Sequence, residues 1–221
     1  MLSALIFDFD GIIVDTEPLH FQAFNQVLAP EGKSFSWEEY CEVYIGFDDR
    51  DAFQHLFKAS GESISKTKLQ ELIQKKAVLF QELIHQEKAV PLPGAVELIQ
   101  SISPTLPTAL CSGALRSDIL PILERLKIRD CFRQIVSAED TSISKPDPAP
   151  YLLTCEKLHL PDPATAVAIE DTPAGILSAK AAGLKVLAIT NSYDREFLVE
   201  ADAITDSLEE VSMSTLEDLV L

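Results

Sequence analysis

The 221-residue sequence predicts an α/β fold with a parallel sheet at its centre and a helical segment inserted after the first strand. Short apolar runs alternate with amphipathic stretches over most of the chain, and this alternation is typical of a parallel sheet covered by helices. The runs are apolar throughout, which indicates strands that are buried on both faces. The predicted strands are Ala4–Phe9, Thr108–Cys111, Gln134–Val136, Ala166–Ile169 and Lys185–Ile189.

The stretches between these strands carry apolar residues three and four positions apart, which is the spacing of an amphipathic helix. Three such stretches follow the first predicted strand in the core. They contain Val96, Leu98, Ile99 and Ile102, then Ile119, Leu120, Leu123 and Leu126, then Ala174, Ile176, Leu177 and Ala181.

The alternation is interrupted by residues 15–90, where successive helical patterns occur without a convincing buried strand. Pro91-Leu92-Pro93-Gly94 ends this segment, because proline and glycine stop a helix. We therefore predict two domains: an α/β core made of residues 1–14 and 91–221, and a helical cap made of residues 15–90. Both connections leave the core near the end of the first strand, as a hinged cap requires.

The charge composition argues against two classes of binding partner. The chain has 18 basic and 35 acidic residues and a formal net charge of −17, so its surface repels nucleic acid and anionic membranes. An anionic substrate then requires a pocket made locally positive by a cation or by a few Lys and Arg side chains. No signal peptide or membrane-spanning segment is recognised, so we expect a cytoplasmic protein, and its mixed surface is compatible with a monomer.

Polar residues follow the predicted strands at the points where the strands end. In an open parallel sheet, ligands bind at the carboxyl ends of the strands, so we expect these residues to lie close together. They supply carboxylates, a hydroxyl group and an ammonium group. The set is Asp8, Asp10, Gly11, Ser112, Gly113, Lys145, Glu170 and Asp171.

These residue types are the ones that phosphoryl transfer uses. Asp8 can act as the nucleophile if a magnesium ion and Lys145 keep it ionised, and Asp10 can protonate the leaving group and later activate water. Glu170 and Asp171 offer the oxygen ligands that magnesium prefers. Ser112 and the backbone N–H groups beside it and after Gly11 can bind the transferred phosphate.

Four ordered segments, DFDGIIVDTE, CSGA, SKPDP and IEDTPAGI, resemble the motifs of the haloacid dehalogenase superfamily. The inserted helical segment resembles the cap of its β-phosphoglucomutase and sugar-phosphate phosphatase group. The resemblance implies a Rossmann-like core with a helical cap. It also implies Asp8 as nucleophile, Asp10 as acid and base, and Ser112 and Lys145 as phosphate ligands. Magnesium is expected on Asp8, Asp171 and the carbonyl of Asp10, with Glu170 in or next to the coordination shell.

The same resemblance suggests substrate or gating roles for several residues outside the core set. The mutases carry an arginine three residues after the cap glycine Gly46, where this chain has Asp49. They also carry a Lys-Asn pair after the serine, which this chain lacks. Both departures weaken the interpretation as a mutase. The suggested substrate and cap residues are Gly11, Thr16, His20, Arg50, Lys76, Gly113 and Arg116.

We therefore expect a magnesium-dependent phosphatase that hydrolyses small phosphorylated metabolites, with sugar or polyol phosphates favoured by the resemblance. A sugar-phosphate mutase remains an alternative, because it uses the same aspartates. A non-catalytic protein that binds a phosphorylated metabolite is an alternative of a different class, although binding alone does not require both a nucleophile and an acid.

Overall fold

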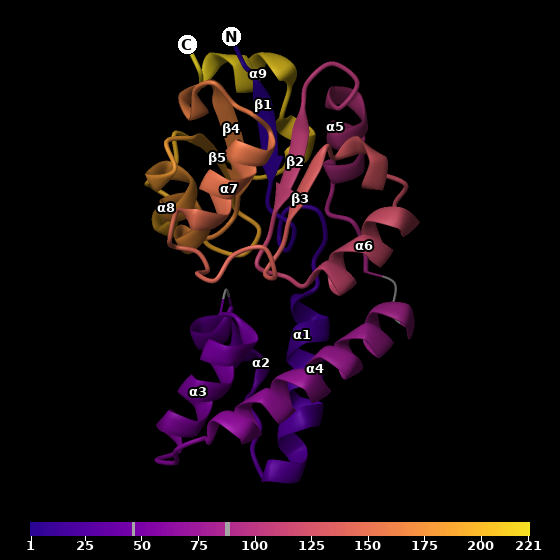
Figure 1. Cartoon of the computed structure of the whole chain (residues 1–221), viewed down its shortest axis with the longest axis vertical. Coiled ribbons are helices and arrows are strands. Elements are labelled where there is room, and N and C mark those ends of the chain that lie inside the picture. Colours follow the sequence, from indigo (N-terminus) through magenta and orange to yellow (C-terminus); the bar gives the residue numbers. More distant parts are fainter. Residues whose placement is uncertain (46, 87–88) are drawn as a thin grey trace. The chain divides into compact units, whose positions relative to one another are not determined.

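The computed structural model describes residues 1–45, 47–86 and 89–221. These residues form two compact units, one made of Met1–Asp15 with Val90–Leu221 and the other of Thr16–Ala89. We call the first unit the core and the second the cap, and we describe each by itself (Figure 1).

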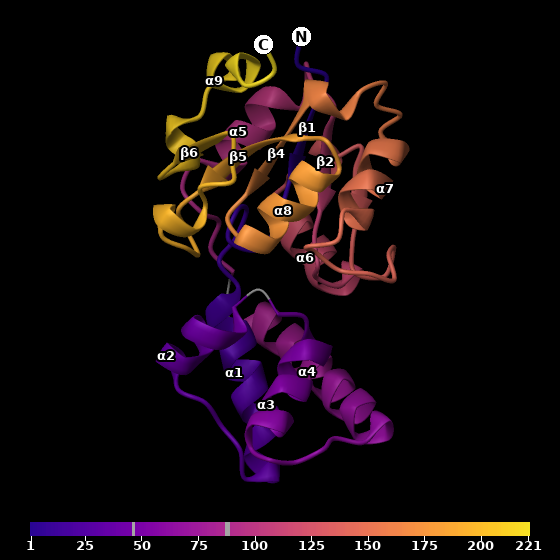
Figure 2. The same ribbon diagram turned by 90° about the vertical axis from the view of Figure 1, so that its left-hand side faces the viewer.

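A parallel sheet forms the centre of the core, with the strand order β3-β2-β1-β4-β5-β6. Figure 2 shows β1, β2, β4 and β5 as neighbours in the middle of this unit. The predicted Rossmann-like α/β fold is therefore confirmed. The strands are β1 (Ala4–Phe7), β2 (Thr108–Cys111), β3 (Gln134–Val136), β4 (Ala166–Glu170), β5 (Lys185–Ile189) and β6 (Ala203–Thr205).

The apolar character of the central strands follows from burial on both sides of the sheet. All residues of β1, β2 and β4 are buried. Ala4 and Ile6 pack in one cluster with Tyr151 and Ile176, which come from two helices on the same face. Because side chains alternate along a strand, Leu5 and Phe7 point to the opposite face.

Helices cover the sheet in the core. Figure 1 draws α7 and α8 on one side of the strands and α5 and α6 on the other. Thr172 caps the start of α8 by accepting a hydrogen bond from the Gly175 N–H, and Pro173 is its first residue. The core helices are α5 (Ala95–Ile102), α6 (Arg116–Arg125), α7 (Ala149–Lys157), α8 (Pro173–Ala181) and α9 (Met213–Asp218).

The edge strand β6 was not among the predicted strands. Its three residues, Ala203 to Thr205, are only half-buried, and Asp202 and Asp206 flank them. A half-buried edge strand of this length has too few apolar positions to give a recognisable pattern. Parallel pairing with β5 stabilises it.

The cap is helical. Its helices pack around an aromatic cluster that includes Phe24, Phe35, Tyr40 and Phe53, each of which is almost fully buried. In the part of the chain that the structure describes, no helix is long and apolar enough to cross a membrane. The cap helices are α1 (Glu17–Leu28), α2 (Trp37–Glu39), a π-helical turn (Tyr40–Tyr44), α3 (Asp49–Ala59) and α4 (Lys66–Gln86).

The two chain segments that lead to and from the cap are joined to each other within the core. Val14 forms an antiparallel bridge with Pro91, and the Leu92 N–H donates to the Ile13 carbonyl over 2.9 Å. The chain therefore leaves and re-enters the core at one place, beyond the end of β1.

Candidate active site

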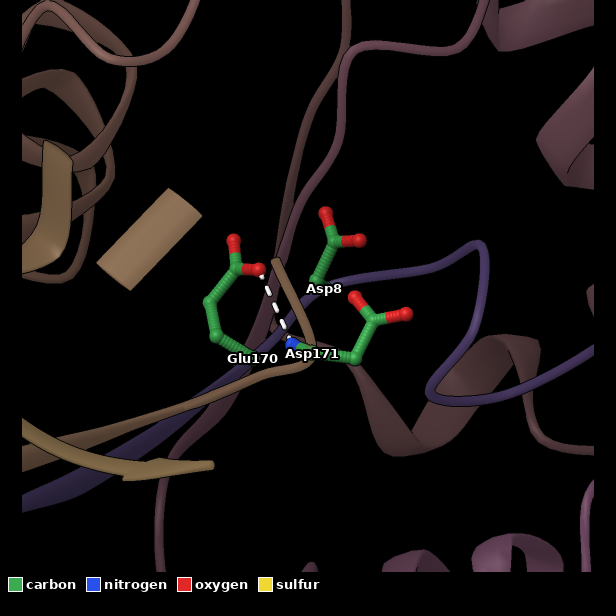
Figure 3. A group of neighbouring side chains, drawn as sticks. All are labelled: Asp8, Glu170 and Asp171. Atoms are coloured by element: carbon green, nitrogen blue, oxygen red, sulfur yellow. Dashed lines mark hydrogen bonds between the residues drawn. The ribbon is translucent and has the colours of Figure 1, made fainter. Parts of the chain in front are cut away.

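Three carboxylates converge at the carboxyl ends of the two central strands. Asp8 directly follows β1, Glu170 is the last residue of β4, and Asp171 follows it. Because β1 and β4 are adjacent parallel strands, one oxygen from each carboxylate lies within 4.8 Å of the others (Figure 3). All three residues are buried, so their mutual repulsion is only weakly screened by water.

Lys145 supplies positive charge to this cluster from the loop between β3 and α7. Its Nζ atom lies 2.7 Å from Asp8 Oδ1 and 2.6 Å from Glu170 Oε1. The ammonium group also donates to the Cys111 carbonyl at the end of β2, over 3.0 Å. Lys145 thus joins residues from three strand ends.

The charged groups in the cluster shift one another's pKa values. Burial raises the pKa of Asp8 to about 7, the Lys145 ammonium opposes this shift, and the Glu170 carboxylate adds to it. Burial alone lowers the pKa of Lys145, but the Asp8 and Glu170 carboxylates outweigh it and hold that pKa well above its ordinary value. The Lys145 ammonium therefore does not fully offset the effect of burial on the pKa of Asp8.

Gly11 allows the chain after β1 to approach Asp171 closely. Its φ angle is +75°, and a Cβ atom at this position would overlap the Asp171 carboxylate. Ser192 donates a hydrogen bond to Asp171 Oδ2, and Asn191 donates to the Gly11 carbonyl over 2.7 Å. The segment after β5 therefore holds both Gly11 and Asp171 in place.

The two remaining predicted core residues also lie at strand ends. Ser112 follows β2 and is buried, and its Oγ accepts a hydrogen bond from the Ala114 N–H over 2.9 Å, beside the exposed Gly113. Asp10 is half-buried, and its negative charge contributes to raising the pKa of Asp8. The structure thus brings the predicted core set to one edge of the sheet, while the role of each residue stays a prediction.

Arg116, one of the suggested substrate residues, is bound to β3 and to the loop after it. Its Nη2 atom donates to Asp140 Oδ2 over 2.6 Å and to the Ile135 carbonyl over 3.0 Å. Its backbone N–H donates to the Glu139 carboxylate. These contacts give Arg116 a part in holding that loop.

In the cap, two of the predicted residues form a buried polar cluster. The Lys76 Nζ atom lies 2.6 Å from His20 Nδ1 and 2.6 Å from Asp49 Oδ1. The Lys76 side chain is 2% exposed and its ammonium lies over the rings of Phe24 and Phe80, at 4.6 and 5.0 Å from their centroids. Burial and the Lys76 charge hold the pKa of His20 well below its ordinary value, so the imidazole is neutral at pH 7.

The other predicted cap residues lie elsewhere in that unit. Thr16 is buried immediately before α1, and Arg50 is exposed in the first turn of α3. Gly46, the cap glycine used to align the chain with the mutases, lies outside the described residues. Asp49, which departs from the arginine of the mutases, is paired with Lys76 in the structure.

Sequence reasoning missed four residues that surround the core cluster. Asn191 and Ser192 follow β5, so the rule that ligands gather at strand ends could have found them if it had been applied to that strand. Gly175 lies in α8 within the motif IEDTPAGI but was not singled out, whereas Tyr151 lies in α7 and carries no local signal. The Tyr151 hydroxyl donates to Glu170 Oε1 over 2.7 Å, and burial holds the pKa of this phenol well above its ordinary value.

The donor chemistry of the carboxylate cluster fits a divalent cation. Asp8, Glu170 and Asp171 offer oxygen atoms, which hard cations such as Mg²⁺ prefer, and the described part of the cluster contains no sulfur or imidazole ligand. Three carboxylates around a single ammonium group also leave an excess of negative charge. A bound cation would offset that excess and favour the ionised form of Asp8.

The chain is similar to known proteins over nearly its whole length. Residues 5–189 match the model of the family described as haloacid dehalogenase-like hydrolase. A protein named phosphorylated carbohydrates phosphatase from Thermotoga maritima is 30% identical over 224 residues, and the match covers 99% of this chain and all of the relative.

Solved structures show the same fold. The crystal structure of CbbY from Rhodobacter sphaeroides in complex with phosphate has a TM-score of 0.89 at 25% identity, covering 98% of this chain and 100% of that one. A β-phosphoglucomutase from Clostridium difficile has a TM-score of 0.88 at 22% identity, covering 100% and 97%. The family match, the full-length relatives and the acidic cluster at the ends of β1 and β4 agree: this chain belongs to the haloacid dehalogenase-like hydrolases.

Proposed function

We propose that the protein is a magnesium-dependent phosphatase that hydrolyses small sugar or polyol phosphates through a phospho-aspartate on Asp8. The observation that carries the proposal is the position of the Asp8 carboxylate, 2.7 Å from the Lys145 ammonium and beside Glu170 and Asp171. This arrangement supplies a nucleophile, positive charge for the phosphoryl oxygens and oxygen ligands for a cation. The similarity to a phosphorylated carbohydrates phosphatase supports the same substrate class.

In the first step, an Asp8 oxygen attacks the phosphorus atom and the bond to the leaving alkoxide oxygen breaks. Asp10 enters this step in its protonated form and gives its proton to that oxygen, so the products are the phosphorylated Asp8 and a free alcohol. Lys145 offsets the charge of the phosphoryl oxygens, and Ser112 donates a hydrogen bond to them. A bound Mg²⁺ would supply further positive charge at Asp8 and the phosphate, held by Asp8, Asp171 and the Asp10 carbonyl, with Glu170 in or next to the shell.

In the second step, water attacks the phosphorus atom of the phospho-aspartate. Asp10, now ionised, takes the proton from the water, and the bond between phosphorus and the Asp8 oxygen breaks. Inorganic phosphate leaves, and both aspartates return to their starting protonation states. The cycle is a net hydrolysis and consumes one water for each phosphate released.

The mutase alternative requires the cap to bind a second phosphate group. The Asp49 carboxylate pairs with Lys76 over 2.6 Å, so the charge of this lysine is already neutralised within the cap. A carboxylate at that place also repels a phosphate. This pairing favours hydrolysis of singly phosphorylated substrates over transfer between two phosphorylated positions.

The test is phosphate release from a panel of sugar, polyol and aryl phosphates, with Mg²⁺ and with excess EDTA. We expect release only with Mg²⁺, and a loss of at least about 1,000-fold in Asp8→Asn, because removing a nucleophile typically costs that much. Asp162→Asn is the control, because it removes the same charge from an exposed residue of the same unit. We expect it to leave phosphate release unchanged. Turnover that persists in Asp8→Asn would contradict the mechanism.

The same panel separates the alternatives. Isomerisation of a hexose phosphate that is stimulated by a trace of bisphosphate, without net phosphate release, would favour the mutase. Measurable ligand binding without turnover of any compound would favour a binding protein.

A further inference from the structure

The Glu170 carboxylate is surrounded by hydrogen-bond donors from the protein itself. Its Oε1 atom accepts from the Lys145 ammonium over 2.6 Å and from the Tyr151 hydroxyl over 2.7 Å. Its Oε2 atom accepts from the Asp171 N–H and from the Thr172 hydroxyl, each over 3.2 Å; Figure 3 draws the first of these two bonds. Glu170 is also fully buried.

This number of donors matches what the side chain can accept. An ionised carboxylate has about four lone-pair positions on its two oxygens. Four protein donors occupy about that number, so a cation could bind Glu170 only by displacing one of them. The carboxylate also packs directly on Gly175, where a Cβ atom would overlap it, so it has little room to turn away from its donors.

Tyr151 is the residue of this group that contacts both charged partners. Its hydroxyl bonds Glu170, and the Lys145 Nζ atom lies 3.4 Å from the same hydroxyl oxygen and 4.8 Å from the centre of the ring. Tyr151 is fully buried in α7, packed in the cluster that covers one face of the sheet. The phenol therefore holds the carboxylate from a rigid element and gives the ammonium an aromatic face.

From these contacts we infer that Glu170 and Tyr151 are positioning residues for Lys145, and that the cation is held by Asp8 and Asp171 without Glu170. Tyr151 orients Glu170, and Glu170 holds the Lys145 ammonium 2.7 Å from Asp8, where a phosphoryl oxygen arrives. The part that concerns phosphate rests on the proposed function. The part that concerns the cation does not, because metal binding can be measured without turnover.

Tyr151→Phe tests the inference, because it removes one hydroxyl and keeps the ring and the charge. Two dissociation constants are measured by calorimetry: that of Mg²⁺, and that of inorganic phosphate at saturating Mg²⁺. We expect the Mg²⁺ constant to change by less than about twofold. We expect phosphate affinity and kcat to fall about tenfold, the effect of losing one hydrogen bond to a charged group.

A cation bound by Glu170 would give a different result. Losing a hydrogen bond behind a metal ligand typically weakens the metal by about 10- to 100-fold. An increase of that size in the Mg²⁺ dissociation constant of Tyr151→Phe would overturn the inference. An unchanged phosphate constant would also overturn it, because Lys145 would then not depend on Tyr151.

Thr108→Val is the matched control for structural damage. Thr108 is also fully buried, and it is the first residue of β2, at the opposite end of that strand from the site. Its hydroxyl donates one hydrogen bond to the Cys131 carbonyl. We expect Thr108→Val to lower the melting temperature without changing either dissociation constant. If it changed them as Tyr151→Phe does, the effect of Tyr151 would be one of general stability and the inference would fail.

A second pair of variants covers the case in which Tyr151→Phe folds poorly. Glu170→Gln and Asp171→Asn remove the same charge from adjacent residues. We expect Asp171→Asn to weaken Mg²⁺ at least about tenfold more than Glu170→Gln does, because only Asp171 is a ligand. Equal losses would overturn the inference. If wild type binds Mg²⁺ but releases no phosphate from any compound, the proposed function fails while this comparison still decides the ligand set.

Discussion

A lysine lies at the centre of the polar cluster in the core and another at the centre of the cluster in the cap, and the two are held in different ways. Lys145 in the core lies between two carboxylates, Asp8 and Glu170. Lys76 in the cap lies between the Asp49 carboxylate and the His20 imidazole, which is neutral at pH 7. The cap cluster is therefore balanced in charge, whereas the core cluster keeps an excess of negative charge.

This difference indicates what each region can do. The core cluster gains stability from a cation, because burial already raises the pKa of Asp8 to about 7 without one. The cap cluster has no such excess, and its ammonium is enclosed by Phe24 and Phe80. The protein leaves negative charge uncompensated only in the core cluster of these two, so a cation would be stabilised there, whereas the cap cluster needs no further ion.

Replacing each lysine with methionine tests the comparison most strongly. Lys145→Met leaves two buried carboxylates facing each other, so we expect the metal-free protein to lose about 3 kcal/mol of unfolding free energy. Lys76→Met leaves Asp49, whose side chain is 25% exposed, and puts an apolar chain between two aromatic rings, so we expect a loss of less than about 1 kcal/mol. Urea unfolding at pH 7.5 in EDTA measures both, and equal losses would contradict the comparison.

Two glycines with positive φ angles allow a second test. Gly11→Ala in the core would push a Cβ atom into the Asp171 carboxylate, so we expect Mg²⁺ affinity to fall by about 10- to 100-fold. Gly32→Ala in the cap, at a φ of +68°, meets open space. We expect it to cost only about 1 kcal/mol of stability and to leave Mg²⁺ affinity unchanged. Calorimetric titration and thermal unfolding distinguish the two outcomes.

The pH dependence of Mg²⁺ binding gives a third test. The cation binds the ionised form of Asp8, and the pKa of this carboxyl is raised to about 7 in the metal-free protein. Below about pH 7 a proton must therefore leave as Mg²⁺ binds, and we expect the affinity to fall about tenfold for each pH unit. Above that pH it should level off. Titrations between pH 5.5 and 8.5 measure the slope, and a flat profile would show that Asp8 is ionised throughout.

A fourth test concerns His20 in the cap. Its pKa is lowered in the folded protein, so below its ordinary value of about 6.5 the unfolded chain binds a proton that the folded chain does not. Stability should therefore decrease as the pH falls below 6.5, by at most about 1.4 kcal/mol per unit. In His20→Gln this part of the pH dependence should disappear. Urea unfolding of both proteins at pH 5.0, 6.0 and 7.0 makes the comparison.

Much of the fold was predictable because it depends on local patterns. The five buried strands are continuous apolar runs, and all five were predicted to within two residues at each end. β6 was missed because an edge strand of half-buried residues lacks such a run. Membership of the family was also predictable and is confirmed, because the four motifs occur in the family's order.

The site was predictable only where it follows the strand ends. Asp8, Ser112 and Asp171 each come directly after a strand, so their convergence follows from the sheet. Tyr151 and Asp49 do not. Tyr151 reaches Glu170 from a helix, and Asp49 reaches Lys76 across 27 positions of the chain, so neither contact leaves a periodic signal in the sequence.

The bridge between Val14 and Pro91 makes the cap a closed loop whose two ends are fixed by the core. The entropy lost in closing such a loop grows only with the logarithm of its length. Insertions in the cap, or exchange of the whole cap for one of another size, should therefore cost the core sheet little. The cap could then be exchanged at two neighbouring points of the chain, while the strand ends that carry Asp8 and Asp171 keep their positions.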